Sequence, residues 1–375
     1  MKKLLIALLA ISALINATAQ EKQDLSLEDA VNTALGNNYG IITIQKGQEL
    51  AELKNNWGTA GALPNIRFVG SGNYTKGFNS ENSYTSENIN ATVELKQTLF
   101  RGFGIRIQKN RLEKLEKLSE ENVSFVVENT TFNVILSYYT ILLVREQVAI
   151  AQSNMHLSKD RYQRAQERKE IGSARTYEVL QAKNAFLQDS SEYLSAQSSY
   201  NNAVRELNYL MAEPMEQSYR FTSDFKADTT SFSRSVLTDK MLENNKTLRN
   251  QYINLELAKL DIKAAKSAYY PSLSLNASGG YSVSETSAQA FDRNPDGYNA
   301  SAGISLTYTL FNGNQRKQAL EAAKIESQIA DIEQEEMIQD LKNQLAQEYE
   351  LYNVRKQLLK VAKENLEAAE LNLKI

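Results

Sequence analysis

The side chains that usually perform covalent or metal chemistry are scarce in this chain of 375 residues, which has one histidine and no cysteine. The lack of cysteine excludes disulfides, thiolate metal sites and cysteine nucleophiles, and a single histidine leaves few options for zinc. His156 lies at helical spacing in a long amphipathic segment, where a structural role is the simpler interpretation. Gly70-Ser71-Gly72 and Gly102-Phe103-Gly104 lack the third glycine or the Lys-Ser/Thr of a phosphate-binding loop. The carboxylates are scattered along helices without an isolated pair, so we expect no enzyme and no cofactor.

Charge and hydropathy exclude two further classes of protein. The chain carries 42 Lys and Arg against 45 Asp and Glu, a net charge of -3, so it has no basic excess for binding nucleic-acid phosphates. Its hydrophobic fraction of 42% and mean hydropathy of -0.46 exclude a polytopic helical membrane protein.

The first 19 residues have the features of a secretory signal peptide. Lys2 and Lys3 form a basic start, residues 4–15 are a short apolar run, and residues 17–19 form an Ala-Thr-Ala cleavage site. A membrane anchor is the alternative, but the apolar run is shorter than the ~20 residues that a span requires. We therefore expect the mature chain to start near Gln20.

Beyond this segment the sequence has no run of 18 apolar residues, so we expect any membrane crossing to use β-strands. Four segments alternate strictly between polar and apolar residues over the ~9–11 residues that a transmembrane strand needs. The expected strands are about 65–75, 88–99, 272–283 and 299–310, with turns over the polar, Gly- and Ser-rich segments 76–86 and 284–297.

The two faces of these strands differ in chemistry. A face rich in Ser, Thr and Asn suits a water-filled lumen, whereas an apolar face suits lipid. The residues expected to face the lumen are Arg67, Asn73, Asn90, Thr92, Glu94, Lys96, Ser274, Asn276, Ser305 and Thr307. The residues expected to face lipid are Ile66, Phe68, Val93, Leu95, Leu273, Leu275, Ile304 and Leu306. A soluble antiparallel sheet alternates similarly and is the alternative at this point.

Four strands are too few to close a barrel. An open sheet in lipid would leave backbone N–H and C=O groups unsatisfied along both edges, at several kcal/mol per group. If these strands cross a membrane, several chains must therefore combine.

The chain is internally duplicated. The matches 207 positions apart are Asn37-Asn38 with Asn244-Asn245, Pro64 with Pro271, and Gly72 with Gly279. The matches 211 positions apart are residues 98–100 with 309–311, and Gly102 with Gly313. Each copy reads as helix, strand, strand and long helix, and only the first adds a returning helix. We expect repeat 1 over 20–212, a linker over 213–237, and repeat 2 over 238–375, cut short before its own returning helix.

Residues 105–171 contain neither proline nor glycine and are expected to form one helix, ~100 Å long at 1.5 Å per residue. Such a helix must pack against neighbours in a coiled-coil-like wall. Gly172 is expected at the C′ position, and a returning helix over 174–212 then completes a hairpin. One continuous helix that tolerates the glycine is the alternative.

Together these features resemble the TolC-like outer-membrane efflux proteins, also called outer membrane factors. The resemblance covers Gln20 to Ile375. The segments that carry it are Leu27-Glu28-Asp29-Ala30, Asn37-Asn38, Leu63-Pro64, Tyr270-Pro271, residues 97–100 (QTLF), 308–311 (YTLF), 161–172, and 176–182 (TYEVLQA).

The resemblance implies an α+β membrane protein of the outer membrane that assembles as a homotrimer. Each protomer would give four strands to a 12-stranded β-barrel, long helices to a periplasmic α-barrel, and residues 213–237 to an equatorial belt. The implied function is the passive exit duct of a tripartite efflux or type I secretion system, with an inner-membrane pump of RND, ABC or MFS type. A periplasmic membrane-fusion adaptor would dock on the hairpin tip, at Ile171, Gly172, Ser173, Arg175 and Thr176.

Two choices stay open at the level of the sequence. Export of drugs or small toxic molecules is not distinguished from export of proteins, because the pump selects the transported molecule. A periplasmic coiled-coil structural or adaptor protein with a soluble β-domain is the alternative function. We assign no gate residues, since in the family these lie largely in a second hairpin for which we find no counterpart.

Overall fold

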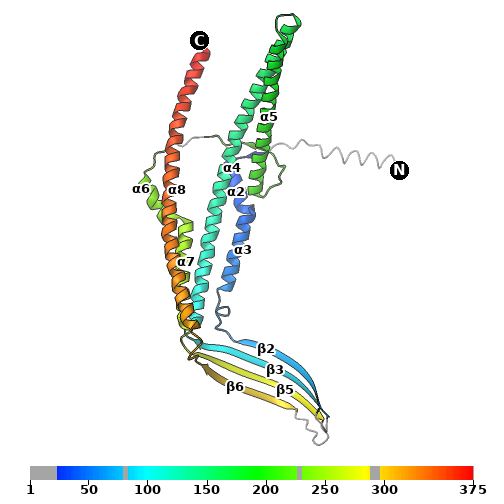
Figure 1. Ribbon diagram of the computed structural model, residues 1–375, viewed down its shortest axis with the longest axis vertical. Coiled ribbons are helices and arrows are strands. Elements are labelled where there is room, and N and C mark those ends of the chain that lie inside the picture. Colours follow the sequence, from blue (N-terminus) through cyan, green and yellow to red (C-terminus); the bar gives the residue numbers. More distant parts are fainter. Residues whose placement is uncertain (1–22, 79–82, 226–229, 288–295, 375) are drawn as a thin grey trace, which may run out of the picture. The chain divides into compact units, whose positions relative to one another are not determined.

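A computed structural model describes residues 23–78, 83–225, 230–287 and 296–374, so the expected signal peptide lies outside the described residues. Thirteen elements follow one another along these residues. In chain order they are β1 (Gln23–Leu25), α2 (Leu27–Asn37), α3 (Tyr39–Lys54), β2 (Asn65–Phe78), β3 (Ser83–Arg101), α4 (Gly104–Glu170), α5 (Thr176–Met211), β4 (Tyr219–Phe221), α6 (Arg234–Asn244), α7 (Lys246–Ser267), β5 (Ser272–Ser287), β6 (Gly297–Thr307) and α8 (Gln315–Lys374) (Figure 1).

The chain forms two compact units, one within residues 1–44 and 124–230 and the other within 45–123 and 231–375. The helices α3 and α4 contribute to both units. The first unit holds the α4–α5 hairpin and the short strands β1 and β4, and the second holds the four long strands with α7 and α8.

The four long strands form one antiparallel sheet in the order β2-β3-β5-β6 (Figure 1). Lys96 of β3 lies opposite Asn65 of β2 on one side and Asn276 of β5 on the other. In the second hairpin Ser272 lies opposite Thr307. Adding the repeat offsets to the first pair gives this second pair, because 65 + 207 = 272 and 96 + 211 = 307. The two copies therefore form hairpins with the same register.

The strands extend beyond the expected turns. The strand β2 continues to Phe78 and β3 begins at Ser83, so both ends of the expected turn 76–86 are paired strand. The strand β5 likewise continues to Ser287. The expectation was wrong because Ser, Thr and Gly do not stop a backbone ladder, which continues wherever the opposite strand offers partners.

The last strand ends earlier than expected, at Thr307 rather than near residue 310. In the first copy the equivalent region reaches Arg101 because β5 pairs with it, with Phe100 opposite Leu273 after a register shift beyond Thr98. The outer side of β6 has no strand partner among the described residues. The strand β6 therefore ends early at the place where it has no neighbouring strand to pair with.

The first helix of each copy is two helices, whereas the sequence predicted one. Asn38 ends α2 with φ -59° and ψ 124°, and its Oδ1 accepts hydrogen bonds from the N–H groups of Gly40 (2.9 Å) and Ile41 (3.2 Å). Asn245, 207 positions later, has φ -62° and ψ 120° and accepts from the N–H of Leu248 at 2.9 Å. An asparagine amide that caps the following helix competes with the helical backbone bonds and so breaks the run.

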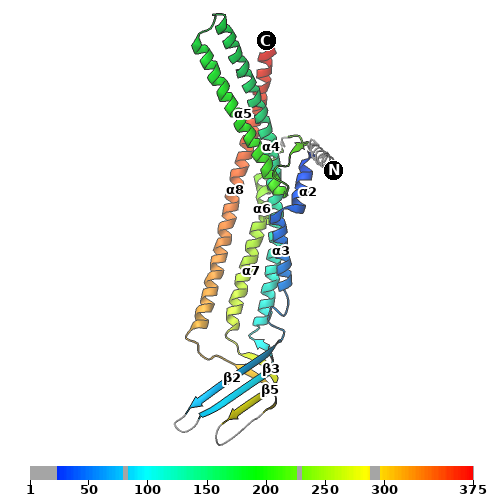
Figure 2. The same ribbon diagram turned by 90° about the vertical axis from the view of Figure 1, so that its right-hand side faces the viewer.

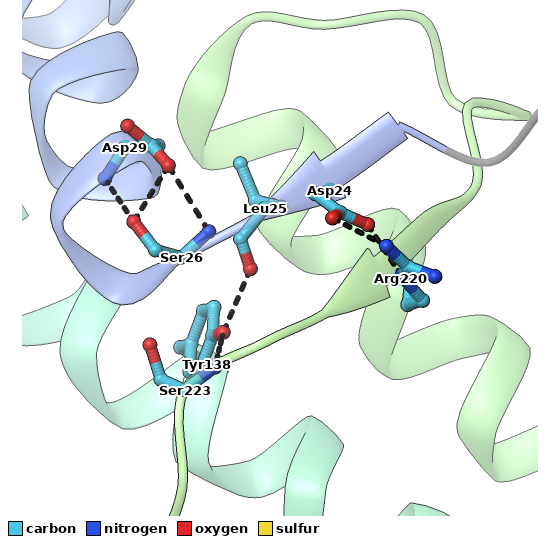
Figure 3. Close-up of polar contacts among 7 residues, drawn as sticks. All are labelled: Asp24, Leu25, Ser26, Asp29, Tyr138, Arg220 and Ser223. Atoms are coloured by element: carbon cyan, nitrogen blue, oxygen red, sulfur yellow. Dashed lines mark hydrogen bonds and ion pairs between the residues drawn. The ribbon is translucent and has the colours of Figure 1, made fainter.

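The hydrophobic core of the first unit gathers side chains from α2, α4, α5, β1 and β4. The tyrosine at its centre, Tyr138, is fully buried, donates a hydrogen bond to the carbonyl of Leu25 (2.8 Å) and accepts one from the N–H of Ser223 (3.1 Å), as Figure 3 shows. In the same view Arg220 of β4 makes two hydrogen bonds of 2.5 Å with Asp24 of β1. These contacts fix the segment after α5 onto the helices.

The expected linker, residues 213–237, has more structure than the sequence predicted. The strand β4 pairs with β1 in parallel, and three-residue strands show no periodicity that a sequence could reveal. The helix α6 begins inside the expected linker, and the N–H of Leu237 donates to the carbonyl of Ser233 at 3.1 Å. Neither proline nor glycine occurs between 230 and 267 to keep this segment out of a helix.

One described helix, α4, has a stretch that could cross a membrane by length and composition alone. Part of its apolar surface is used in the core of the first unit, where Val134 and Ile141 are fully buried. Another part forms a seven-residue repeat between 51% and 63% exposed, made of Leu136, Leu143, Ile150 and Leu157. A repeat of seven is the spacing of a coiled-coil seam, so this side of α4 suits a neighbouring helix.

Candidate functional site

The polar face of the sheet gathers every residue that the sequence predicted to face a lumen. Side chains alternate between the two faces of a strand, so directly opposite residues share a face. Arg67 lies opposite Glu94, Thr92 opposite Gly280, and Ser274 opposite Ser305. Following the register across all four strands puts these residues on one face together with Asn73, Asn90, Lys96, Asn276 and Thr307.

The opposite face gathers the residues predicted to meet lipid. Ile66 lies opposite Leu95, Phe68 opposite Val93, and Leu273 opposite Leu306, while Leu275 lies opposite Ile304. Several of these side chains are open to solvent in the single chain, with Phe68 72% and Leu306 68% exposed. An exposed apolar face of this size is typical of a surface that is covered by a membrane or by another protein.

The charges on the polar face lie toward the ends of the strands that join the helices. The guanidinium of Arg67 donates through Nε to the Oε2 atom of Glu94 at 2.6 Å. The positive charge of Arg67 and the negative charge of Glu94 therefore compensate each other. A hollow of about 670 Å³ lies over this region, lined by Asn65, Arg67, Glu94, Lys96, Asn276, Ser278, Ser301 and Ser305 together with five less polar residues. Away from this group, the described polar face is lined mainly by neutral polar side chains.

Two pairs of serines meet across β5 and β6, and the sequence did not predict these contacts. The hydroxyls of Ser274 and Ser305 are 3.0 Å apart, and those of Ser278 and Ser301 are 2.8 Å apart. The two members of each pair come from separate segments of sequence, and only the register shows that they meet. The period-two pattern alone places each serine on the polar face, which is the signal that the sequence offers.

The hairpin tip between α4 and α5 has the geometry expected for Gly172 at the C′ position. Gly172 has φ +78°, where glycine is free of the strain that a Cβ brings. Its N–H donates to the carbonyl of Lys169 (2.9 Å), and the N–H of Ser173 donates to that of Arg168 (2.7 Å). These two bonds form a Schellman motif, which closes α4 and presents Ile171, 80% exposed, at the tip.

The remaining tip residues lead into α5. Arg175 is the N-cap residue and makes no side-chain capping bond, and Thr176 is the first helical residue. Residues 174 and 175 lie outside the helix, so the returning helix starts two residues later than predicted. The two helices also touch at Tyr162 and Phe186, whose rings stack with centroids 6.3 Å apart.

No group of three or more His, Asp or Glu side chains that could hold a metal ion occurs within the described ranges. His156 is exposed on α4 and belongs to no such group. The arrangement on the described strands is a polar surface on one face of the sheet and an apolar surface on the other.

Comparison with known proteins connects this geometry to a family. The family model described as "Outer membrane efflux protein" matches residues 30–213 and 237–375. The chain belongs to this family. Membership places it in the outer membrane, among efflux proteins.

Individual relatives are distant. The chain is 23% identical to the outer membrane protein TolC of Salmonella enteritidis over 333 residues, 85% of this chain and 66% of the relative. It is 23% identical to the alkaline protease secretion protein AprF of Pseudomonas aeruginosa over 267 residues, 69% of this chain and 54% of the relative. The chain thus spans about half to two thirds of the length of these relatives.

Solved structures show the same fold. The Campylobacter jejuni CmeC outer membrane channel superposes with a TM-score of 0.71 at 18% identity, over 93% of this chain and 74% of that chain. The Vibrio cholerae outer membrane protein VceC gives a TM-score of 0.68 at 14% identity, over 92% and 83%. These likenesses show that the chain shares the fold of both proteins.

Proposed function

We propose that three copies of this outer membrane efflux family chain close into one channel, which serves as the exit duct of a tripartite efflux or type I secretion system. The observation that carries the proposal is the four-stranded sheet with one apolar face and two edges that pair with no other strand in the described part of the chain. In lipid each unsatisfied backbone group costs several kcal/mol, so the edge of β2 and the edge of β6 need partners. Three sheets of four strands make a 12-stranded barrel without any free edge.

The duplication supports closure by identical neighbours. Inside one chain, the second strand of the first hairpin, β3, pairs with the first strand of the second hairpin, β5. Between two chains, the same relation joins β6 of one copy to β2 of the next. Glu94 lies opposite Ser278 inside the chain, and the repeat offsets convert this pair into Ser305 opposite Ser71 of the next copy.

The helices support the same assembly. The seven-residue apolar repeat on α4 has a counterpart on α5, where Leu180, Leu187 and Leu194 are between 54% and 66% exposed. Apolar stripes on both helices of a hairpin call for further helices on either side. Neighbouring protomers supply them if the helices form a barrel in the periplasm, with residues 213–237 as a belt around it.

The mechanism in this proposal is passive conduction. A lumen lined by Ser, Thr and Asn hydrates a moving solute, and the inner-membrane pump supplies both the energy and the choice of drug, toxic molecule or protein. The periplasmic adaptor docks on the tip formed by Ile171, Gly172, Ser173, Arg175 and Thr176. A periplasmic structural or adaptor role is disfavoured, because the chain belongs to an outer-membrane family.

Disulfide trapping tests the closure. The chain has no cysteine, so the double variant Ser71→Cys with Ser305→Cys introduces the two thiols alone. Opposite residues of antiparallel strands have Cα atoms about 4.5–5.5 Å apart, within reach of a disulfide. Inside one chain these two residues lie on the first and last strands of the sheet, so only neighbouring copies can be linked. Oxidised membranes should show covalent dimers and trimers on a non-reducing gel.

The matched control moves one thiol by two residues on the same face. Asn73→Cys with Ser305→Cys puts the Cα atoms about 7–8 Å apart, beyond the usual range for a disulfide. Efficient linking in the control pair but not in the test pair would refute the register. A protein that stays monomeric and soluble without detergent would refute the duct itself. For the tip, a cysteine at Ser173 that gives no adaptor adduct in exporting cells would refute docking there.

A further inference from the structure

We propose that Lys96 forms a positively charged ring in the barrel lumen and makes the barrel favour anionic over cationic solutes. The proposal rests on the trimeric duct described above, in which the polar face of the sheet lines the lumen. It adds a class of preferred solute, small anions such as carboxylates, sulfonates and phosphates, and a residue that sets the preference.

The starting point is the small number of charges on this face. Over the described residues of the four long strands, the register assigns the polar face four charged side chains: Arg67, Glu94, Lys96 and Arg101. The strands β5 and β6 contribute none to it. The other charged residues of these strands, Lys76, Glu87 and Glu285, alternate onto the opposite face.

Two of the four charges cancel. Arg67 holds Glu94 through both Nε and its terminal nitrogen on the Oε2 atom, at 2.6 and 2.5 Å. Arg101 is the last residue of β3, and its guanidinium lies beside Gly104, at the start of α4. It therefore adds a positive charge at the foot of the strand. Lys96 is the remaining charge, and it stands within the sheet.

The surroundings of Lys96 leave its charge uncompensated. Its two cross-strand neighbours are Asn65 and Asn276, which are neutral. The nearest carboxylate along the strand, Glu94, is already bound by Arg67, and Lys96 has no ion pair among the described residues. The side chain is exposed and borders the hollow of about 670 Å³ on the polar face.

Three copies would place three such lysines around one water-filled passage. An anion inside the ring is attracted by all three ammonium groups and a cation is repelled by all three, over roughly the Debye length of ~8 Å at 0.15 M salt. For a lumen radius of about 10 Å and the dielectric constant of water, the anion-to-cation ratio of local concentrations changes by about 3-fold at 0.15 M and by about tenfold or more at 0.01 M. The effect therefore grows as salt is removed.

A cysteine reporter measures this ratio directly. Ser301→Cys places a single thiol on the exposed polar face of β6, two strands away from Lys96. The purified full-length protein in lipid nanodiscs is treated with two small methanethiosulfonates, one carrying a sulfonate and the other a trimethylammonium. The ratio of their reaction rates, relative to the same ratio for free glutathione, reports the charge near the thiol.

Ser301 lies about 12 Å from the nearest Lys96, so we expect Lys96→Gln to lower this ratio by about 1.5-fold at 0.15 M salt and about 3-fold at 0.01 M, and Lys96→Arg to retain it. Lys76→Gln removes one positive charge from the opposite face and should leave the ratio unchanged.

The possible outcomes distinguish a failure of the charge ring from a failure of the proposed lumen. If Ser301→Cys reacts quickly and its ratio does not change in Lys96→Gln at either salt concentration, the charge ring is refuted and the lumen stands. If Ser301→Cys does not react, or if Ile304→Cys on the apolar face reacts equally fast in the lipid, the polar face is not a lumen and both proposals fail.

Discussion

The buried hydroxyl of Tyr138 is predicted to hold the β1–β4 segment onto the first unit. In Tyr138→Phe the ring still fills the core, but two backbone groups lose a hydrogen bond. The carbonyl of Leu25 retains a bond from the N–H of Thr222 at 3.2 Å, so its loss is partial, about 1 kcal/mol. The N–H of Ser223 loses the only hydrogen bond found for it within the described ranges. Because this group is half-buried, we expect the loss to cost about 1 kcal/mol of folding free energy. The expected sum is about 2 kcal/mol.

Thermal unfolding and hydrogen exchange measure this loss. For a unit of about 150 residues, ~2 kcal/mol lowers the midpoint by about 4–8 °C. The amides of β1 and β4 should exchange about 30-fold faster, the equivalent of ~2 kcal/mol, while those of the sheet keep their rates. The second readout shows where the stability is lost.

Tyr139→Phe is the matched control. Tyr139 touches the rings of Tyr138 and Phe225 at 6.3 and 5.6 Å, and its hydroxyl makes no hydrogen bond within the described part of the chain. The ring contacts survive in phenylalanine, so the change in stability should stay near zero. Equal effects in both variants, or a Tyr138→Phe protein within about 0.5 kcal/mol of wild type, would show that the two bonds do not hold this segment.

Three further predictions concern two turn glycines and the β1–β4 ion pair. A methyl on Gly102 (φ +55°) would overlap the backbone at the end of α7, so Gly102→Ala should cost ~3 kcal/mol or more and prevent folding. Gly313 (φ +64°) has open space in one chain, so Gly313→Ala should cost the monomer only the backbone strain of a left-handed alanine, about 1–2 kcal/mol. By the repeat offsets Gly313 faces Ala60 of the next copy, so the same variant should also weaken the trimer, and an unchanged trimer-to-monomer ratio on semi-native gels would contradict this. The hydrogen bond from Arg220 lowers the pKa of Asp24 below 3.8. The stabilisation that this ion pair gives is therefore complete above that pH and is lost as the pH falls through the lowered pKa. Hydrogen exchange of the β1 amides should rise only in acid, and Asp24→Asn should show the raised exchange at every pH.

The sequence by itself determined the classes of element and the two faces of the sheet. Strict alternation has a period of two, and the period holds whatever the neighbours of a strand are. The apolar residues from Ile66 to Leu306 therefore share a face as predicted. The glycine at 172 ended the long helix where expected, because an αL residue at C′ is a local requirement of the backbone.

The sequence also located features whose structural meaning it did not reveal. The paired asparagines at 37–38 and 244–245 were visible as a repeat, but not as breaks between two helices. The helical pattern continues through Asn38 and Asn245, and only the side-chain caps show that the backbone leaves the helix. Similarly, residues 213–237 were expected to form a linker because they fall outside the helical pattern, although three of them form a parallel strand with β1.

Only the tertiary structure decided which residues meet. Arg67 and Glu94 stand 27 positions apart, and their pairing depends on the register of one hairpin. Without that pairing Lys96 is one of three nearby charges. With it, Arg67 and Glu94 compensate each other, and Lys96 alone of the three keeps an uncompensated charge. The contact of Tyr138 with Leu25 and Ser223 joins segments more than 80 positions apart. Local periodicity carries no information on such distances, because it fixes the direction of a side chain along one element and not the element that it faces.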